Sequence, residues 1–120
     1  MKYMLLIYGN EDLWSSFPED EMARVIRETD ALQEELRASG EFVGAYGVAD
    51  QVMAKTVTVA GGSPVVTDGP YIEAKEYLGS FDIIDCESMD RALEIAARVP
   101  FARYGKVEVR PLMHESAPEV

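Results

Sequence analysis

The order in which strand-like and helical segments follow one another is the strongest constraint on the fold of this chain. Four segments rich in branched and aromatic residues are predicted to be strands: 2–8, 42–49, 80–86 and 107–112. Two segments with apolar residues at helical spacing are predicted to be helices: 18–39 and 89–99. This strand–helix–strand order occurs twice, and it predicts an α+β, ferredoxin-like antiparallel sheet with two helices on one face.

The longer helix has clear signals at both ends. Pro18 suits a first helical position, three acids follow it at the positive helix end, and Gly40 supplies the stop. One face of this helix carries a stripe that is predicted to enter the core: Met22, Val25, Ile26, Thr29, Leu32 and Leu36. The shorter helix has Ser88 as a plausible N-cap and ends at Pro100.

The remaining segments are predicted to be a hairpin, a loop and a tail. Residues 55–60 and 64–67 alternate in strand fashion around Gly61 and Gly62, so they predict a short hairpin inserted into the fold. Residues 11–17 are predicted to be a loop, and 113–120 to be a polar tail. No linker or repeat interrupts residues 1–120, which are therefore expected to form one domain.

Composition limits the partners of the chain. Twenty-two acidic residues against eleven basic ones give a net charge of −11, which disfavours nucleic-acid phosphates and anionic lipid surfaces. No stretch has the length of a membrane span, and the first residues do not follow a secretory signal pattern, so a cytoplasmic protein is expected. The single cysteine, Cys86, fits a reducing compartment and is predicted to be a small buried hydrophobe.

The predicted sheet leaves one face without helices. Apolar side chains on that face need cover, and a second copy of the chain supplies it most simply. A homodimer in which two sheets pack face to face is therefore expected.

The segment from Asp68 to Gly79 is long for the connection between two strands. Hairpin loops are commonly two to five residues, whereas this one holds several ionisable side chains and a Gly-Pro pair. Loops on a rigid scaffold often carry binding chemistry, so the segment is the predicted location of a site.

The same segment carries a family resemblance. Residues 66–79, VTDGPYIEAKEYLG, resemble the DGPF-type branch of the YCII-related proteins, and so do MKYMLLIYG at residues 1–9 and GKVEVRPL at 105–112. The resemblance implies a dimeric α+β barrel of ferredoxin-like subunits. It also implies a small stand-alone bacterial protein from a group in which some members are thought to be enzymes and most have no established activity.

This chain departs from the family pattern at three points. The fourth motif position, usually phenylalanine, is Tyr71, and the usual Gly-Gly pair is Gly79-Ser80. A histidine in the proposed site of the broader family has no obvious counterpart, because the only histidine, His114, lies in the predicted tail, where it is expected to be exposed. An acid–base mechanism carried over from those relatives therefore lacks one of its groups.

Asp68 is the predicted catalytic residue. Beside aromatic rings its carboxylate could act as a general base, although an aspartate before Gly-Pro can equally accept backbone N–H bonds and fix the turn. The predicted substrate-binding residues are Tyr71, Glu73, Lys75, Glu76, Tyr77 and Arg110. A helical turn would bring Glu73 and Glu76 to one side of the loop. Each residue also has a structural alternative: the tyrosines could pack over the loop, Glu73 to Glu76 could be a solvated loop in which Lys75 pairs with an acid, and Arg110 could pair with an acid on a neighbouring strand.

Asp82 is the other notable acid. Strand alternation places it on the same face as Ser80 and Ile84, where a carboxylate is costly unless it is paired or reached by water. It is therefore predicted to face either a polar cavity or the dimer seam. No phosphate loop, nucleotide fingerprint or nucleophile–base pair occurs, and no metal site or cofactor is predicted.

Three functions remain open on the sequence. The first is a cofactor-independent enzyme that moves a proton on a small organic substrate, in a cleft beside the loop of Asp68 to Tyr71. The second is a non-catalytic dimer that binds a metabolite or a protein partner in a regulatory setting. The third is a scaffold dimer whose motif loop only builds the interface.

Overall fold

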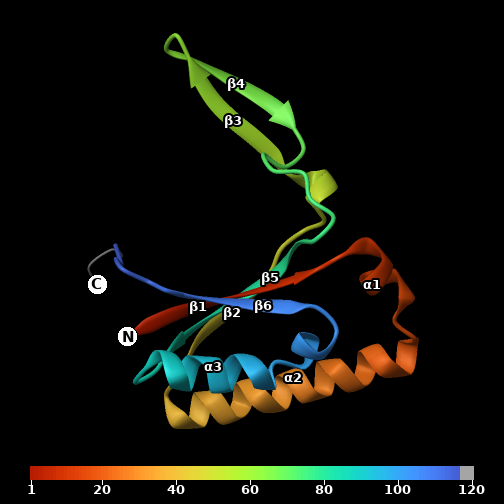
Figure 1. Cartoon of the computed structure of the whole chain (residues 1–120), viewed down its shortest axis with the longest axis vertical. Coiled ribbons are helices and arrows are strands. Elements are labelled where there is room, and N and C mark those ends of the chain that lie inside the picture. Colours follow the sequence, from red (N-terminus) through yellow and green to blue (C-terminus); the bar gives the residue numbers. More distant parts are fainter. Residues whose placement is uncertain (117–120) are drawn as a thin grey trace.

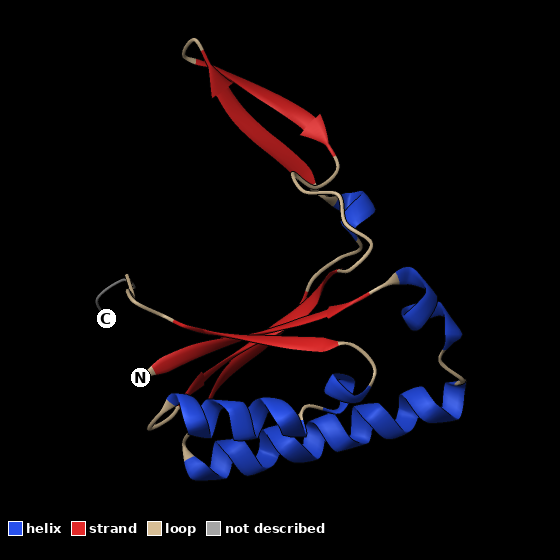
Figure 2. Ribbon diagram, in the orientation of Figure 1, coloured by secondary structure: helices blue, strands red, loops and turns tan. Residues whose placement is uncertain are grey.

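The computed structural model describes residues 1–116, and its centre is a four-stranded antiparallel sheet in the order β2-β5-β1-β6 (Figure 1). The strands of this sheet are β1 (Lys2–Gly9), β2 (Phe42–Gly47), β5 (Tyr77–Asp85) and β6 (Lys106–Pro111). The longer helices, α2 (Glu19–Ser39) and α3 (Met89–Arg98), lie side by side on one face of the sheet (Figure 2). The predicted α+β, ferredoxin-like arrangement is confirmed.

The segment predicted to be a loop at residues 11–17 is instead mostly helical. The helix α1 spans Glu11–Ser16, and the Asn10 side chain caps it by accepting a 2.8 Å hydrogen bond from the Leu13 backbone N–H. Asparagine followed by two acids is a recognisable helix start, so this signal was present in the sequence. Two short 3₁₀ turns, η1 (Gln51–Met53) and η2 (Pro100–Arg103), complete the helical elements of the described chain.

The strand after the motif segment starts earlier than predicted. It begins at Tyr77, because Tyr77 and Leu78 pair with Gly9 and Tyr8 at the end of β1. The irregular segment is therefore only 69–76. The strand limits are otherwise close to the predicted ones, and the pairing of β2 with β5 has a register shift between Phe42 and Gly44.

The core lies between the sheet and its two helices. Its largest fully buried side chains come from β1, β5, α3 and α2: Leu5, Ile84, Ile95 and Val25. Cys86 is buried beside them, as predicted. The predicted stripe on α2 is mostly correct, but Ile26 is 51% exposed because it lies beyond the edge of the face that meets the sheet.

The inserted hairpin projects away from this body (Figure 1). It consists of β3 (Lys55–Ala60) and β4 (Ser63–Asp68), which pair only with each other. Its turn uses Gly61 and Gly62, both at positive φ, where a residue with a Cβ would be strained. All its residues except Thr56 are exposed, so the hairpin contributes no side chain to the buried core.

The sheet face opposite the helices is open in the single chain. Leu6 and Phe81 lie opposite each other on it, as do Met4 and Ile83, and Tyr46 stacks on Phe81 with ring centroids 5.2 Å apart. The described tail, residues 112–116, has no regular structure, and His114 in it is exposed as predicted. Residues 117–120 of the predicted tail lie outside the described residues. No helix in the described part of the chain is long and apolar enough to cross a membrane.

An ion pair joins α3 to the connection between α2 and β2. Arg91 donates from Nε and Nη2 to the two carboxylate oxygens of Glu41, at 2.9 and 2.8 Å, and Ser39 also donates to Glu41. These contacts, the Arg91 hydrogen bonds first, lower the pKa of Glu41 to about 2. The Glu41 side chain is only 16% exposed, so water screens this pair less than the other ion pairs of the helices.

Replacement of Glu41 by glutamine is expected to lower the free energy of unfolding by roughly 1–2 kcal/mol at neutral pH. A lowered pKa stabilises the fold above the ordinary value of 4.5, and this contribution disappears as the pH falls through about 2. The difference between wild type and Glu41→Gln in urea unfolding should therefore shrink toward zero in acid. Glu34→Gln is the matched control, because Glu34 is 78% exposed and pairs with Arg37 at the surface. Equal losses of stability in Glu41→Gln and Glu34→Gln would contradict a larger contribution from the Glu41–Arg91 pair.

Candidate functional site

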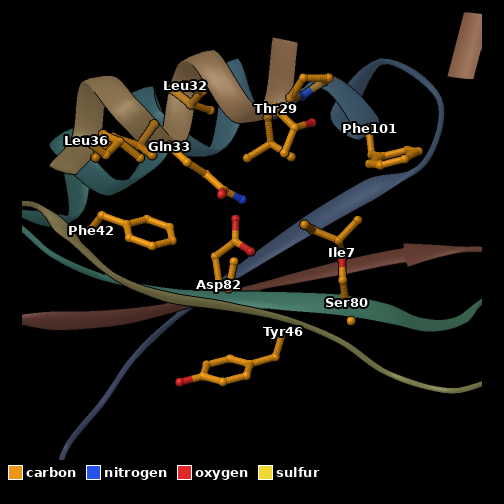
Figure 3. A pocket seen from close by; sticks show the side chains of 15 residues that line it. Ile7, Thr29, Leu32, Gln33, Leu36, Phe42, Tyr46, Ser80, Asp82 and Phe101 are labelled. Atoms are coloured by element: carbon orange, nitrogen blue, oxygen red, sulfur yellow. The ribbon is translucent and has the colours of Figure 1, made fainter. Parts of the chain in front are cut away.

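A cavity of about 210 Å³ lies between the sheet and helix α2 (Figure 3). Strands β1, β2 and β5 line one side of it, α2 lines the opposite side, and residues of α3 and η2 complete the wall. The walls are mainly apolar and include Ile7, Leu32, Phe42 and Phe101. Such a mostly apolar cavity with a few polar groups is the common form of a small-molecule site.

Asp82 is the one acidic side chain among the residues that line this cavity. It points from β5 toward α2 (Figure 3), on the same side of the strand as buried Ile84, which confirms the predicted alternation. Burial raises the pKa of Asp82 from 3.8 to about 6, with no ion pair or hydrogen bond from the described residues opposing it. Asp82 therefore lies in a cavity and not on the open sheet face, but the walls of this cavity are mainly apolar, whereas a polar cavity was predicted.

Gln33 faces Asp82 from the opposite wall. Its side-chain amide points toward the Asp82 carboxyl group (Figure 3), because Gln33 lies one helical turn after Thr29 on the sheet-facing side of α2. The Thr29 hydroxyl is already engaged, since it donates to the Val25 carbonyl at 2.8 Å. Gln33 is therefore the polar side chain of α2 that is placed to act with Asp82, whereas Ser80 lies on the same strand as Asp82, beside Ile7 (Figure 3). Sequence reasoning missed it, because one glutamine on an amphipathic helix resembles any boundary residue.

Asp68 lies elsewhere, at the end of β4 and the base of the hairpin. Its side chain is 88% exposed and accepts a hydrogen bond from the Lys55 ammonium group at 2.5 Å. Lys55 is its cross-strand partner in the hairpin register. Asp68 lines a wide, open depression together with Asp50, Glu73 and Lys75. The structure thus brings three predicted site residues, Asp68, Glu73 and Lys75, to one surface that is separate from the Asp82 cavity.

Residues 73–76 form an exposed loop, which was one of the two predictions for them, and not the helical turn that would have paired Glu73 with Glu76. Residues 71–76 are bends without helical hydrogen bonds, because the chain must run from the hairpin base back into β5. Tyr71 is 80% exposed, so it packs over nothing in the single chain. Glu76 instead contacts the opposite side of the loop, where it accepts a 3.5 Å hydrogen bond from the Asn10 amide.

Tyr77 and Arg110 have local partners. The Tyr77 hydroxyl donates to Glu11 at 3.1 Å, and burial together with this hydrogen bond raises the pKa of Tyr77. Arg110 forms an ion pair with Glu108, two residues away on its own strand, rather than with an acid on a neighbouring strand. Within residues 1–116, no cluster of three or more histidine, cysteine or acidic side chains has the arrangement needed to hold a metal ion.

Comparison with known proteins agrees with this fold. The model of the YCII-related domain matches residues 1–116. An uncharacterised protein of Rhizobium meliloti (strain 1021) is 35% identical over 114 residues, which cover 93% of this chain and 92% of that protein. A family match over nearly the whole length, together with a relative of this similarity, establishes membership. The chain belongs to the YCII-related family.

Proposed function

We propose that the Asp82 cavity is the active site of a cofactor-independent enzyme that transfers a proton on a small, uncharged carbonyl compound. The observation that carries the proposal is the position of Asp82: a carboxylate with an elevated pKa, in an apolar cavity, opposite an amide side chain. Strongly perturbed acids in cavities are frequent at functional sites. A base whose pKa is about 6 is mostly ionised at neutral pH and still basic enough to accept a proton.

The chemistry needs only two groups. The Asp82 carboxylate would take a proton from the carbon next to the carbonyl, and the electron pair of that C–H bond would move onto the carbonyl oxygen. The Gln33 amide N–H would donate to this developing enolate oxygen, which is how preorganised donors stabilise negative charge in a transition state. The protonated Asp82 would then return the proton to carbon or to oxygen.

The charges around the cavity support an uncharged substrate. Its lining residues include no lysine or arginine, and the chain as a whole carries a net charge of −11. A carboxylate or phosphate ligand would be repelled by Asp82 and by the surrounding field. A neutral carbonyl compound meets no such penalty.

The depression beside Asp68 is the second candidate site. Its residues carry the DGPF-type signature, and on that signature we place the chain in the DGPF-type branch of its family. Asp68 is exposed and paired with Lys55, whereas a general base gains from partial burial. The geometry therefore favours Asp82 over Asp68.

Binding without turnover is the alternative function. Asp82 is the only acidic residue that lines its cavity, so the lining has no second carboxyl group to form an acid–base pair with it. A regulatory dimer that holds a neutral metabolite would need only the cavity and the Asp82–Gln33 pair.

Deuterium exchange tests the proposed reaction directly. The protein is incubated in D₂O with a panel of small neutral ketones and aldehydes, and loss of the α-proton signal is followed by NMR. Exchange above the buffer rate that saturates with substrate is the expected result. If compounds of the panel stabilise the protein but none exchanges its α-proton, the binding alternative is supported instead. If there is neither stabilisation nor exchange, both the enzyme and the binding proposals are overturned.

The dimer expected from the sequence is part of this proposal, as is a cytoplasmic location. We propose that two copies pack through the open sheet faces, where Met4, Leu6, Phe81 and Ile83 form an apolar patch. Glu108 and Arg110 of β6 lie opposite Leu6 and Met4 at one edge of the patch. Exposed apolar patches with a polar rim commonly mark protein interfaces. The reduced, buried state of Cys86 fits the cytoplasm.

The Ile83→Lys variant is expected to be a monomer in size-exclusion chromatography with light scattering, while the wild type is a dimer. A lysine in the centre of the interface would be buried without a partner, which strongly opposes association. Ile26→Lys is the matched control, because Ile26 is exposed on α2, on the opposite side of the sheet. A monomeric wild type, or a dimeric Ile83→Lys protein, would contradict the arrangement.

A further inference from the structure

A second cavity adjoins the Asp82 cavity and is walled by aromatic side chains. It has a volume of about 330 Å³, and its lining includes Trp14, Tyr77 and Phe101. Two residues, Ser80 and Phe101, line both cavities. The two cavities are therefore neighbours that share part of their walls at β5 and η2, and an elongated ligand is the kind of molecule that would occupy both.

We infer that the ligand of the Asp82 cavity is an uncharged ketone or aldehyde with an aryl group on its carbon chain, called an aryl ketone below. Its aromatic ring binds against Trp14 in this second cavity. The inference rests on the proposed function for the carbonyl end of the ligand and extends it by naming the other end. Trp14 thereby becomes a specificity-determining residue, although it lies in a helix that was predicted to be a loop.

The Trp14 ring is held in place from three sides. Helix α1, capped by Asn10, fixes its backbone. The ring lies directly against Gly9 and Gly79, where an added Cβ would come within 2.3 and 3.0 Å of its Cζ2 atom. Phe101 meets it edge to face, with ring centroids 5.4 Å apart and planes at 78°.

This arrangement needs glycine at position 9, and at position 79 a Cβ would fit only tightly. Any larger residue at position 9 would push the indole away from the strand ends. A ring immobilised in this way loses little freedom when a ligand stacks on it, and preorganisation of this kind favours binding. The cavity is thus prepared for a flat, apolar group before the ligand arrives.

The chemistry of the walls selects an uncharged aromatic group. Trp14, Tyr77 and Phe101 provide faces and edges that suit stacked and edge-to-face contacts. The only charged side chains that line either cavity are Asp50 and Asp82, both acidic. An aryl carboxylate would therefore be repelled, while an aryl ketone of the same length would be accepted.

The protein's single tryptophan makes the test direct. Quenching of Trp14 fluorescence is titrated with 4-phenylbutan-2-one, with butan-2-one and with 3-phenylpropanoate. The aryl ketone is expected to bind at least about tenfold more tightly than butan-2-one, because one buried, stacked ring supplies a difference of that order. The carboxylate is expected to bind more weakly than the aryl ketone. Equal affinity for the two ketones would overturn the inference.

Two variants test whether Trp14 causes the preference for the aryl ketone. Ligand-observed NMR, which needs no tryptophan, should show that Trp14→Leu loses most of the preference for the aryl ketone. Phe17→Leu is the matched control, because Phe17 also packs against Phe101 but does not line either cavity. If Trp14→Leu keeps the preference for the aryl ketone, or if Phe17→Leu loses it equally, the aromatic ring of the ligand binds elsewhere.

The two proposals fail separately. Aryl preference that depends on Trp14 but is accompanied by no deuterium exchange would leave this inference standing and remove the proposed reaction. Saturable exchange with no difference between aryl and alkyl ketones would support the proposed reaction and remove this inference. Asp82→Asn should keep the aryl preference, because the ring does not contact position 82, and loss of the preference in that variant would contradict a separate aryl cavity.

Discussion

Replacement of Asp82 by asparagine is expected to slow deuterium exchange at least about 100-fold, the usual minimum contribution of a general base. Asparagine keeps the shape and the hydrogen-bonding capacity of the side chain but cannot accept a proton. Binding of the ketone should change little, because the apolar walls and Gln33 remain. The loss should therefore fall on kcat, with KM nearly constant, in exchange kinetics followed by NMR.

Asp68→Asn is the comparison that decides between the two candidate sites. Asp68 is exposed and paired with Lys55, so its replacement should leave exchange within about twofold of wild type and cost little stability, as for other surface ion pairs. The opposite pattern, loss in Asp68→Asn with full activity in Asp82→Asn, would move the active site to the depression at the hairpin base. Full activity in both variants would exclude both carboxylates as the base.

The same Asp82→Asn substitution is expected to stabilise the protein above about pH 6 by roughly 2 kcal/mol. The folded protein holds Asp82 at a pKa of about 6, whereas the ordinary value is 3.8. Ionisation is therefore harder in the folded state, and wild-type stability falls as the pH rises from about 4 to about 7. The full difference would correspond to roughly 3 kcal/mol, and contact of the carboxyl group with water in the cavity reduces it.

Urea unfolding of wild type and Asp82→Asn across this pH range measures the effect. The two stability curves should coincide near pH 4, where Asp82 is protonated in the folded state, and separate toward neutral pH. Asp85→Asn serves as the control on the same strand, because Asp85 is exposed and pairs only with the N-terminal amine. A constant offset between wild type and Asp82→Asn at all pH values would show that Asp82 does not titrate as proposed.

These two results together would distinguish a functional acid from a structural one. A residue that is needed for activity but lowers stability is typical of an active site, because natural proteins tolerate such costs where function requires them. The Glu41–Arg91 pair illustrates the opposite case, in which an acid with a lowered pKa joins two elements. The directions of the two pKa shifts thus separate the roles of Asp82 and Glu41.

The candidate site shows which features local sequence patterns predict and which they do not. Alternation along residues 80–86 placed Asp82 on the same face as Ser80 and Ile84, since strand geometry determines which residues share a side. It left open whether that face meets the helices or the dimer seam. The motif loop directed attention to Asp68, whose surroundings depend on how the hairpin leaves the body. Nothing local indicated that this hairpin would project into solvent, because its length and pattern suit a buried hairpin equally well.

The sequence by itself determined the order and type of the main elements, the ferredoxin-like class and the family, because helical and strand periodicities and turn residues are local properties. Only the tertiary structure decided that Gln33 on α2 faces Asp82 on β5, and that Trp14 rests on Gly9 and Gly79. These contacts join residues far apart in the chain, and they depend on where a helix crosses the sheet and on how the strands register. Such long-range geometry results from packing of the whole core, and no short segment of sequence contains it.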